Sequence, residues 1–250
     1  MTEMLFRDDA YLAEATGLVT AITPEGGIVL DRTVFYPRGG GQPGDSGRLA
    51  WESDAAGSAS TGGGEGIAIT DTVKGEDGQI VLVPDRASCL PEVGAEVTQT
   101  LDWDRRYRHM RVHTALHLLS VVIPLPVTGG SIGEDKGRLD FDMPEAPEDK
   151  AVLEERLNAL VARDLPVTED WITDAELAAS PDLVKTMSVK PPMGEGRVRL
   201  IRIGAGEEQV DLQPCGGTHV RTTSEIGALR LGKIEKKGRQ NRRVTLHLAG

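Results

Sequence analysis

Several residue classes are scarce in this 250-residue chain, and each scarcity excludes a class of protein. Its two cysteines cannot build a disulfide framework. No apolar run approaches the roughly 20 residues that a membrane-spanning helix needs. The N-terminal segment carries acidic residues where a signal peptide would have a basic region and an apolar stretch. We therefore expect a soluble, cytoplasmic protein.

Basic charge and aromatic side chains are also in the minority. The chain has 28 Lys and Arg against 39 Asp and Glu, a formal net charge of −11, which excludes a globally basic nucleic-acid binder. Aromatic residues make up 4%, whereas 30 glycines and 14 prolines indicate many loops. A hydrophobic fraction of 39% still indicates a globular protein, and the length suffices for one large domain or two small ones.

The first hundred residues have the pattern of a β-domain. Short apolar runs separated by Gly- and Pro-containing turns predict strands, and their regular spacing favours a small barrel. Residues 53–66 are rich in Gly and Ser and predict a flexible surface loop. Cys89 is expected to be a half-buried loop or strand cysteine. The expected strands are residues 17–22, 28–36, 47–52, 67–75, 79–84 and 94–103.

The character of the sequence changes at Asp102. Residues 102–123 contain no Gly or Pro, and their apolar positions recur at helical spacing, with Asp102 or Asp104 as the N-cap. Helices are also expected at 148–163 and 174–180. The remaining expected strands are 166–173, 197–204, 209–213, 227–238 and 242–250. We therefore predict an α+β protein with a β-barrel domain at 1–101 and a second domain at 102–250.

Two imidazoles stand four residues apart on the long predicted helix. That spacing places His113 and His117 on one face, with Cβ atoms roughly 5–6 Å apart, so both can bind one ion. His109 lies one turn earlier. Because three successive turns cannot easily reach a single ion, His109 is better interpreted as a residue behind the ligands or as an RNA contact.

A thiolate and a third imidazole follow about a hundred residues later, in the segment PCGGTHV. Gly216 and Gly217 allow the tight turn that would bring Cys215 and His219 together. Thiolate and imidazole ligands favour zinc over magnesium or calcium. Four protein ligands would close a structural site, whereas a catalytic zinc keeps one position for water. The ligand count therefore leaves both a catalytic and a structural role open.

Together these motifs form a recognisable pattern. The segments HTALHLL (113–119) and CGGTHV (215–220) resemble the editing domain of alanyl-tRNA synthetases and the free-standing AlaX editing proteins. Three further segments resemble other signatures of that family: TVFYPRGGGQPGDSG (33–47), SIGEDKGRLDFD (131–142) and EIGALRLGKIEKKGRQNRRV (225–244). The resemblance covers nearly the whole chain, and its Gly-rich segment corresponds to the medium-length type.

The resemblance implies both a fold and an activity. The implied fold is a small N-terminal β-barrel followed by a two-layer α/β sandwich like the second additional domain of threonyl- and alanyl-tRNA synthetases. The implied activity is trans-editing, in which the ester between serine or glycine and tRNA(Ala) is hydrolysed. The implied ligands of one Zn²⁺ are His113, His117, Cys215 and His219.

An editing enzyme must spare correctly charged Ala-tRNA(Ala). A pocket that hydrogen-bonds the serine hydroxyl rejects an analogue lacking it by about 10⁴–10⁵. Thr114 is the candidate reader of that hydroxyl; alternatively, it packs in the helix interface or bonds the carbonyl four residues earlier. Gln42 is the candidate catalytic residue from the Gly-rich segment. Alternatively, this segment forms only a turn of the barrel. It lacks the pattern of an ATP-binding loop. Backbone N–H groups of Gly216 and Gly217 could stabilise an oxyanion.

The acidic chain nevertheless has local basic clusters. Residues 228–250 contain seven Lys and Arg against Glu235 alone, and four arginines crowd the start of the histidine helix. Such patches can bind RNA phosphates, although solvated charged surfaces are also common. The candidate contacts to the tRNA(Ala) acceptor end are Arg105, Arg108, Lys233, Lys236, Lys237, Arg239 and Arg242, with Arg106, Arg111, Arg230 and Arg243 in the same clusters.

Two other functions stay open on the sequence alone. The first is a zinc-dependent esterase or amidase that acts on a small molecule. The second is a non-catalytic binding module with a closed structural zinc.

Overall fold

In a computed structural model, the described residues are 1–52, 65–86, 90–145, 147, 149–180, 183–185 and 196–249. They form two compact units. The first comprises Met1–Gly39 and Pro43–Arg106, and the second comprises Gly40–Gln42 and Tyr107–Gly250. A three-residue piece of the Gly-rich segment therefore belongs to the second unit. Cys89 and all but the end of the predicted 53–66 loop lie outside the described residues.

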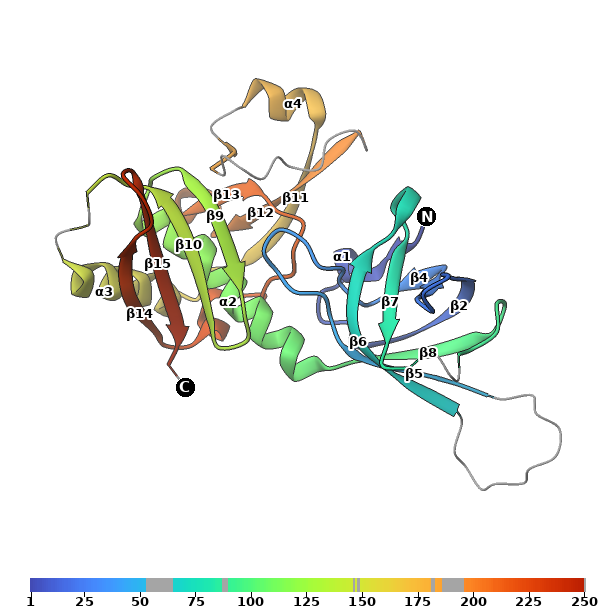
Figure 1. The fold of residues 1–250 in the computed structure, drawn as a ribbon. Coiled ribbons are helices and arrows are strands. Elements are labelled where there is room, and N and C mark those ends of the chain that lie inside the picture. The colour runs from blue at the N-terminus through green and yellow to red at the C-terminus, as the bar shows by residue number, and fades with distance from the viewer. Residues whose placement is uncertain are drawn as a thin grey trace. The chain divides into compact units, whose positions relative to one another are not determined.

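The first unit is built on a closed six-stranded barrel with the strand order β2-β3-β7-β6-β5-β8 (Figure 1). Its strands are β2 (Glu14–Ile22), β3 (Ile28–Leu30), β5 (Gly47–Trp51), β6 (Glu65–Lys74), β7 (Ile80–Pro84) and β8 (Glu96–Leu101). The single strand expected at 28–36 is instead divided, because a second short strand, β4 (Arg32–Thr33), pairs in parallel with β1 (Glu3–Met4). The unit also contains helix α1 (Leu5–Asp8) and the 3-10 turn η1 (Glu76–Gly78).

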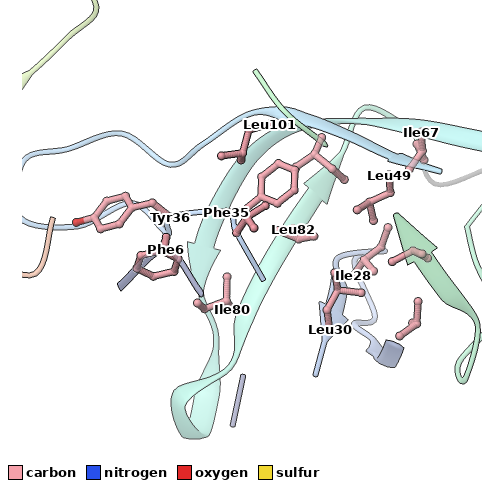
Figure 2. Packing of buried hydrophobic residues seen from close by; sticks show 14 of the residues in the cluster. Phe6, Ile28, Leu30, Phe35, Tyr36, Leu49, Ile67, Ile80, Leu82 and Leu101 are labelled. Carbon is pink, nitrogen blue, oxygen red and sulfur yellow. The ribbon is translucent and has the colours of Figure 1, made fainter. Parts of the chain in front are cut away.

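The barrel strands bury alternate side chains, as the two-residue period of a strand requires. Ile67 and Ile69 of β6, and Ile80 and Leu82 of β7, are buried in this way together with Leu49 of β5. Figure 2 shows side chains from these strands gathered in one apolar cluster. The prediction of a small N-terminal barrel is confirmed.

A buried ion pair also lies in the first unit. Arg106 and Asp45 are both almost completely inaccessible, and the Arg106 guanidinium donates to the Asp45 carboxylate and to the carbonyls of Ala10 and Val34. Arg106 was expected to belong to the basic cluster at the start of the long helix. The structure corrects this expectation, because the Arg106 side chain is enclosed and cannot contact RNA.

The boundary between the two units falls within the long helix α2 (Trp103–Val122). Asp102 begins this helix, since its carboxylate accepts a hydrogen bond from the Arg105 backbone N–H at 3.3 Å. An antiparallel sheet of order β14-β15-β10-β9 forms one layer of the second unit (Figure 1). Its strands are β9 (Val127–Ile132), β10 (Lys136–Asp142), β14 (Leu229–Lys236) and β15 (Asn241–Leu248).

Helix α2 packs on this sheet at a glycine. A Cβ atom at Gly137 of β10 would lie 2.6 Å from Val112 and 3.0 Å from Leu116, so only glycine allows the approach. A second antiparallel sheet has the order β11-β12-β13. The other elements of the unit are β11 (Val167–Thr173), β12 (Arg197–Ile203), β13 (Asp211–Pro214), α3 (Lys150–Ala162), α4 (Asp174–Ala179), η3 (Gly206–Glu208) and η4 (Thr223–Ile226).

The predicted α+β class is confirmed, with each expected helix observed to within a few residues. The strands β9 and β10 were not expected. None of the helices built from the described residues combines the length and the hydropathy that a membrane crossing requires.

Candidate metal centre

Four side chains from two distant segments converge in the second unit. His113 and His117 lie on successive turns of α2, and Cys215 and His219 lie in the loop that follows β13. Their potential ligand atoms all lie within 4.8 Å of one another. Cys215 Sγ is 3.4 Å from His113 Nε2 and 3.3 Å from His219 Nε2. This group could hold a metal ion. His109 is buried on the same helix but does not belong to the group.

Hydrogen-bond partners hold two of these imidazoles in place. Nδ1 of His113 lies 3.0 Å from Gln42 Oε1, and Nδ1 of His117 lies 3.0 Å from Asp211 Oδ2. A carboxylate and an amide oxygen can only accept hydrogen bonds, so each Nδ1 carries the proton and donates it. Nε2 is then the nitrogen of each ring that can bind a metal once it carries no proton, as is usual for histidine ligands.

Thr114 holds the third imidazole, that of His219, through its Nδ1 atom. Its hydroxyl donates to the Met110 carbonyl at 3.0 Å, so it acts as an acceptor towards His219 Nδ1 at 3.2 Å. It also accepts from the Val220 backbone N–H at 3.3 Å and is fully buried. The bond to the carbonyl four residues earlier is the structural alternative that the sequence left open. The contact that the sequence predicts between Thr114 and a substrate hydroxyl stays a prediction.

The Gly-rich segment reaches the centre through Gln42. The Gln42 amide donates to Thr218 Oγ1 at 2.9 Å, and its oxygen accepts from the Thr218 backbone N–H at 3.2 Å. The segment is anchored by a bond from the Ile132 N–H to the Gly41 carbonyl at 2.8 Å. Gln42 is 1% exposed, and its amide is engaged by His113 and Thr218. In this arrangement Gln42 positions the His113 ring.

The two glycines between Cys215 and His219 have different surroundings. A Cβ atom at Gly217 would lie 2.3 Å from His113 Cε1 and 2.8 Å from Gln42 Oε1. At Gly216 a Cβ atom would meet nothing within 4 Å. Gly217 is therefore required for the close approach of the loop to the imidazole, whereas a side chain at position 216 would have room.

Arg199 of β12 holds the same loop, and sequence reasoning did not find it. Its guanidinium donates to the carbonyls of Cys215 at 3.1 Å and Gly217 at 2.8 Å. It also forms an ion pair with Glu169 of β11. The buried Arg199 guanidinium thus fixes two backbone carbonyls of the Cys215–His219 segment, called here the ligand loop.

Asp211 and its neighbours were also missed. Asp211 accepts from the Gln213 side chain at 2.7 Å and forms an ion pair with Lys185, in addition to its bond to His117. A signal was present in the sequence, because Asp211, Gln213 and Cys215 are spaced by two. In a strand that spacing places side chains on one face, so a carboxylate and an amide would accompany the thiolate.

The electrostatics of the centre favour the metal-binding form of its cysteine. Burial by itself raises the pKa of the Cys215 thiol, but His113 and His219 hold that pKa well below its ordinary value. Burial and the neighbouring His113 hold the pKa of His219 well below its usual range. Burial lowers the pKa of His117, but hydrogen bonds to Asp211 and Cys215 outweigh it and raise the pKa to about 9. A metal bound at His117 would therefore compete with a proton.

The predicted RNA contacts have varied surroundings. Arg108 pairs with Asp135, Lys237 pairs with Glu235, and the Arg105 and Arg242 guanidinium groups donate to the carbonyls of Gly44 and Pro144. Lys233, Lys236 and Arg239 are exposed. The role of all seven in RNA binding stays a prediction.

Comparison with known proteins agrees with this geometry. Residues 198–245 match the family described as the threonyl and alanyl tRNA synthetase second additional domain, and residues 6–105 match class II (A) tRNA synthetases. The alanyl-tRNA editing protein AlaX-M of Methanosarcina acetivorans is 34% identical over 98% of each chain. The chain belongs to the AlaX-M family of alanyl-tRNA editing proteins. AlaX-M of Saccharolobus solfataricus is 35% identical, again over 98% of each chain.

This chain also aligns with part of a much larger enzyme. The alanine–tRNA ligase of Pyrobaculum neutrophilum is 35% identical over 94% of this chain, which covers 25% of the ligase. The family resemblance inferred from the histidine and cysteine motifs is thus confirmed over nearly the full length.

Proposed function

We propose that this AlaX-M family member is a trans-editing hydrolase that deacylates tRNA(Ala) carrying serine or glycine. One observation carries the proposal: His113, His117, Cys215 and His219 converge, and each imidazole is held through Nδ1 by a separate partner. Such a substrate would place the protein in the cytoplasm, where translation occurs.

The donor set of the centre fits zinc. A cysteine whose thiolate is stabilised, together with imidazoles whose Nε2 atoms face it, is a combination of soft and borderline ligands that suits Zn²⁺. When bound, zinc would supply Lewis-acid chemistry at an ester carbonyl and at water. The four ligands would be His113, His117, Cys215 and His219.

The remaining residues of the site have positioning roles in this proposal. Gln42 orients His113, Asp211 orients His117, and Thr114 orients His219. Arg199 fixes the ligand loop through its carbonyls, which keeps Cys215 in place. Such partners tune and orient metal ligands, and their loss commonly weakens metal binding.

Two further roles concern the substrate. The backbone N–H groups of Gly216 and Gly217 would stabilise the oxyanion that develops during ester hydrolysis. Thr114 would read the serine hydroxyl only if one of its three present hydrogen bonds opened.

The test is deacylation of Ser-tRNA(Ala), Gly-tRNA(Ala) and Ala-tRNA(Ala), with and without a chelator. The proposal predicts hydrolysis of the serine or glycine ester, sparing of the alanine ester, and loss of the activity on chelation. Turnover of small esters without activity on any tRNA would instead support a small-molecule esterase. Unfolding on chelation, with no hydrolysis in the intact protein, would support a structural zinc.

A further inference from the structure

A cluster of basic side chains surrounds a cavity at the four-stranded sheet of the second unit. A cavity of about 670 Å³ opens beside strand β14, lined by Lys150, Arg230, Lys233 and His247. None of the described residues that line it is acidic. This local excess of positive charge contrasts with the net charge of −11 for the whole chain.

The backbone of β14 shapes the cavity. The register between β14 and β15 shifts between Leu231 and Ile234, which marks a bulge at Gly232 and Lys233. Bulges bend a strand and redirect its side chains. A Cβ atom at Gly232 would lie 3.0 Å from His247 Nε2, so glycine at this bulge leaves room beside the His247 ring.

The cationic groups of the cavity are available to a ligand. Arg230 and Lys233 are exposed, and neither forms an ion pair within the part of the chain that the structure describes. Lys150 donates one hydrogen bond to the Leu231 carbonyl at 3.0 Å, and an ammonium group has two more to offer.

Nearby carboxylates have hydrogen-bond or ion-pair partners outside the cavity, and Glu235 also interacts electrostatically with Lys233. Glu154 accepts from the Leu231 backbone N–H at 2.7 Å, and Glu235 pairs with Lys237 at 3.1 Å. Asp149 caps helix α3 by accepting from the Ala151 N–H. These acids therefore satisfy local groups.

We propose that this cavity binds a backbone phosphate of the tRNA, with its attached ribose. The volume lies within the range of small-ligand pockets, and guanidinium and ammonium groups are the usual protein contacts to phosphate. The inference rests on the proposed editing function, because that function supplies an RNA partner. The inference goes beyond that function because it assigns a phosphate-binding site to Arg230, Lys233 and Lys150.

The experiment measures binding of an uncharged RNA hairpin that carries the tRNA(Ala) acceptor stem, by fluorescence anisotropy over a series of salt concentrations. The double variant Arg230→Gln/Lys233→Gln removes two exposed cations. Each lost phosphate contact reduces the slope of log affinity against log salt by about 0.9, so losing the one phosphate in this cavity should reduce the slope by about 0.9. Arg156→Gln, at an exposed position on α3, is the matched control and should keep the wild-type slope.

The kinetic consequence separates RNA binding from hydrolysis. In the double variant, KM for Ser-tRNA(Ala) should rise while kcat stays unchanged. An unchanged salt slope in a folded double variant would overturn the inference. Loss of inorganic phosphate binding, measured by ³¹P NMR, with an unchanged RNA slope would overturn it too, because the cavity would then take a small anion.

The two proposals fail in different ways. Because the hairpin carries no ester, its binding does not depend on hydrolysis. If the salt dependence of RNA binding falls in the double variant but the wild-type protein never deacylates tRNA, the editing proposal is refuted and the phosphate-binding site is supported. If the protein edits normally and the double variant keeps the wild-type salt dependence of RNA binding, only the phosphate-binding site is refuted.

Discussion

The close contact between Gly217 and His113 gives a sharp prediction for Gly217→Ala. The new Cβ atom would lie 2.3 Å from His113 Cε1, whereas ordinary contacts begin at 3.4 Å. The ring or the loop must therefore move by roughly 1 Å, far more than the tolerance of about 0.2 Å in metal–ligand distances. The same Cβ atom would lie 2.8 Å from Gln42 Oε1, which holds the ring in place.

Two effects should follow from that displacement. Metal affinity should fall by at least about 10–100-fold, the loss usually seen when the support of a ligand is removed. Overpacking should also lower the free energy of unfolding by about 1–3 kcal/mol. Both effects have one cause, because the imidazole cannot occupy its place beside Cys215 while the methyl group is present.

The assay is competition for zinc against a chromophoric chelator, with urea unfolding measured in parallel. Gly216→Ala is the matched control, since it adds the same methyl group one residue earlier in open space. It should keep the wild-type zinc affinity. Equal affinities for wild type and both variants, with Gly217→Ala folded, would refute the reasoning.

The remaining predictions concern three carboxylates and their partners. Asp211→Asn should lower zinc affinity about 10–100-fold in the chelator assay, whereas Asp140→Asn, in the same unit, should leave it unchanged. Arg106→Met should lower the free energy of unfolding, measured in urea, by about 3–5 kcal/mol, because it leaves Asp45 buried without a counter-charge. Adding Asp45→Asn to this variant should restore part of the lost free energy of unfolding. Burial raises the pKa of Asp140, but Arg243 and Arg138 outweigh it and hold that pKa below 3.8. The ionised carboxylate therefore contributes stability above pH 3.8 that is lost as the pH falls through the lower folded value, so Asp140→Asn should flatten this acid dependence of Tm.

The parts of the site that follow local rules could be predicted from the sequence. Helical spacing fixes His113 and His117 on one face whatever the rest of the fold does. The short segment between Cys215 and His219 likewise restricts those two side chains to one loop. What the sequence could not give is the partner of each imidazole, since Gln42 and His113 are 71 residues apart and no periodicity relates them.

The same limit applies to burial and to weak strands. Arg106 has the same charge as its neighbours in the sequence, and only its partner Asp45, 61 residues away, explains why it is enclosed. Strand β9 contains Gly129 and Gly130, which are poor strand formers, so its pairing with β10 is a tertiary effect that local propensity does not show.

The most direct test of the account is a zinc titration of Ser-tRNA(Ala) deacylation. Protein stripped with a chelator should hydrolyse the ester slowly or not at all, and the rate should return in proportion to added zinc until one ion is present per chain. His113→Ala should need far more zinc and should not regain the wild-type rate. Full activity in the stripped protein, or a wild-type titration curve in the variant, would contradict the account.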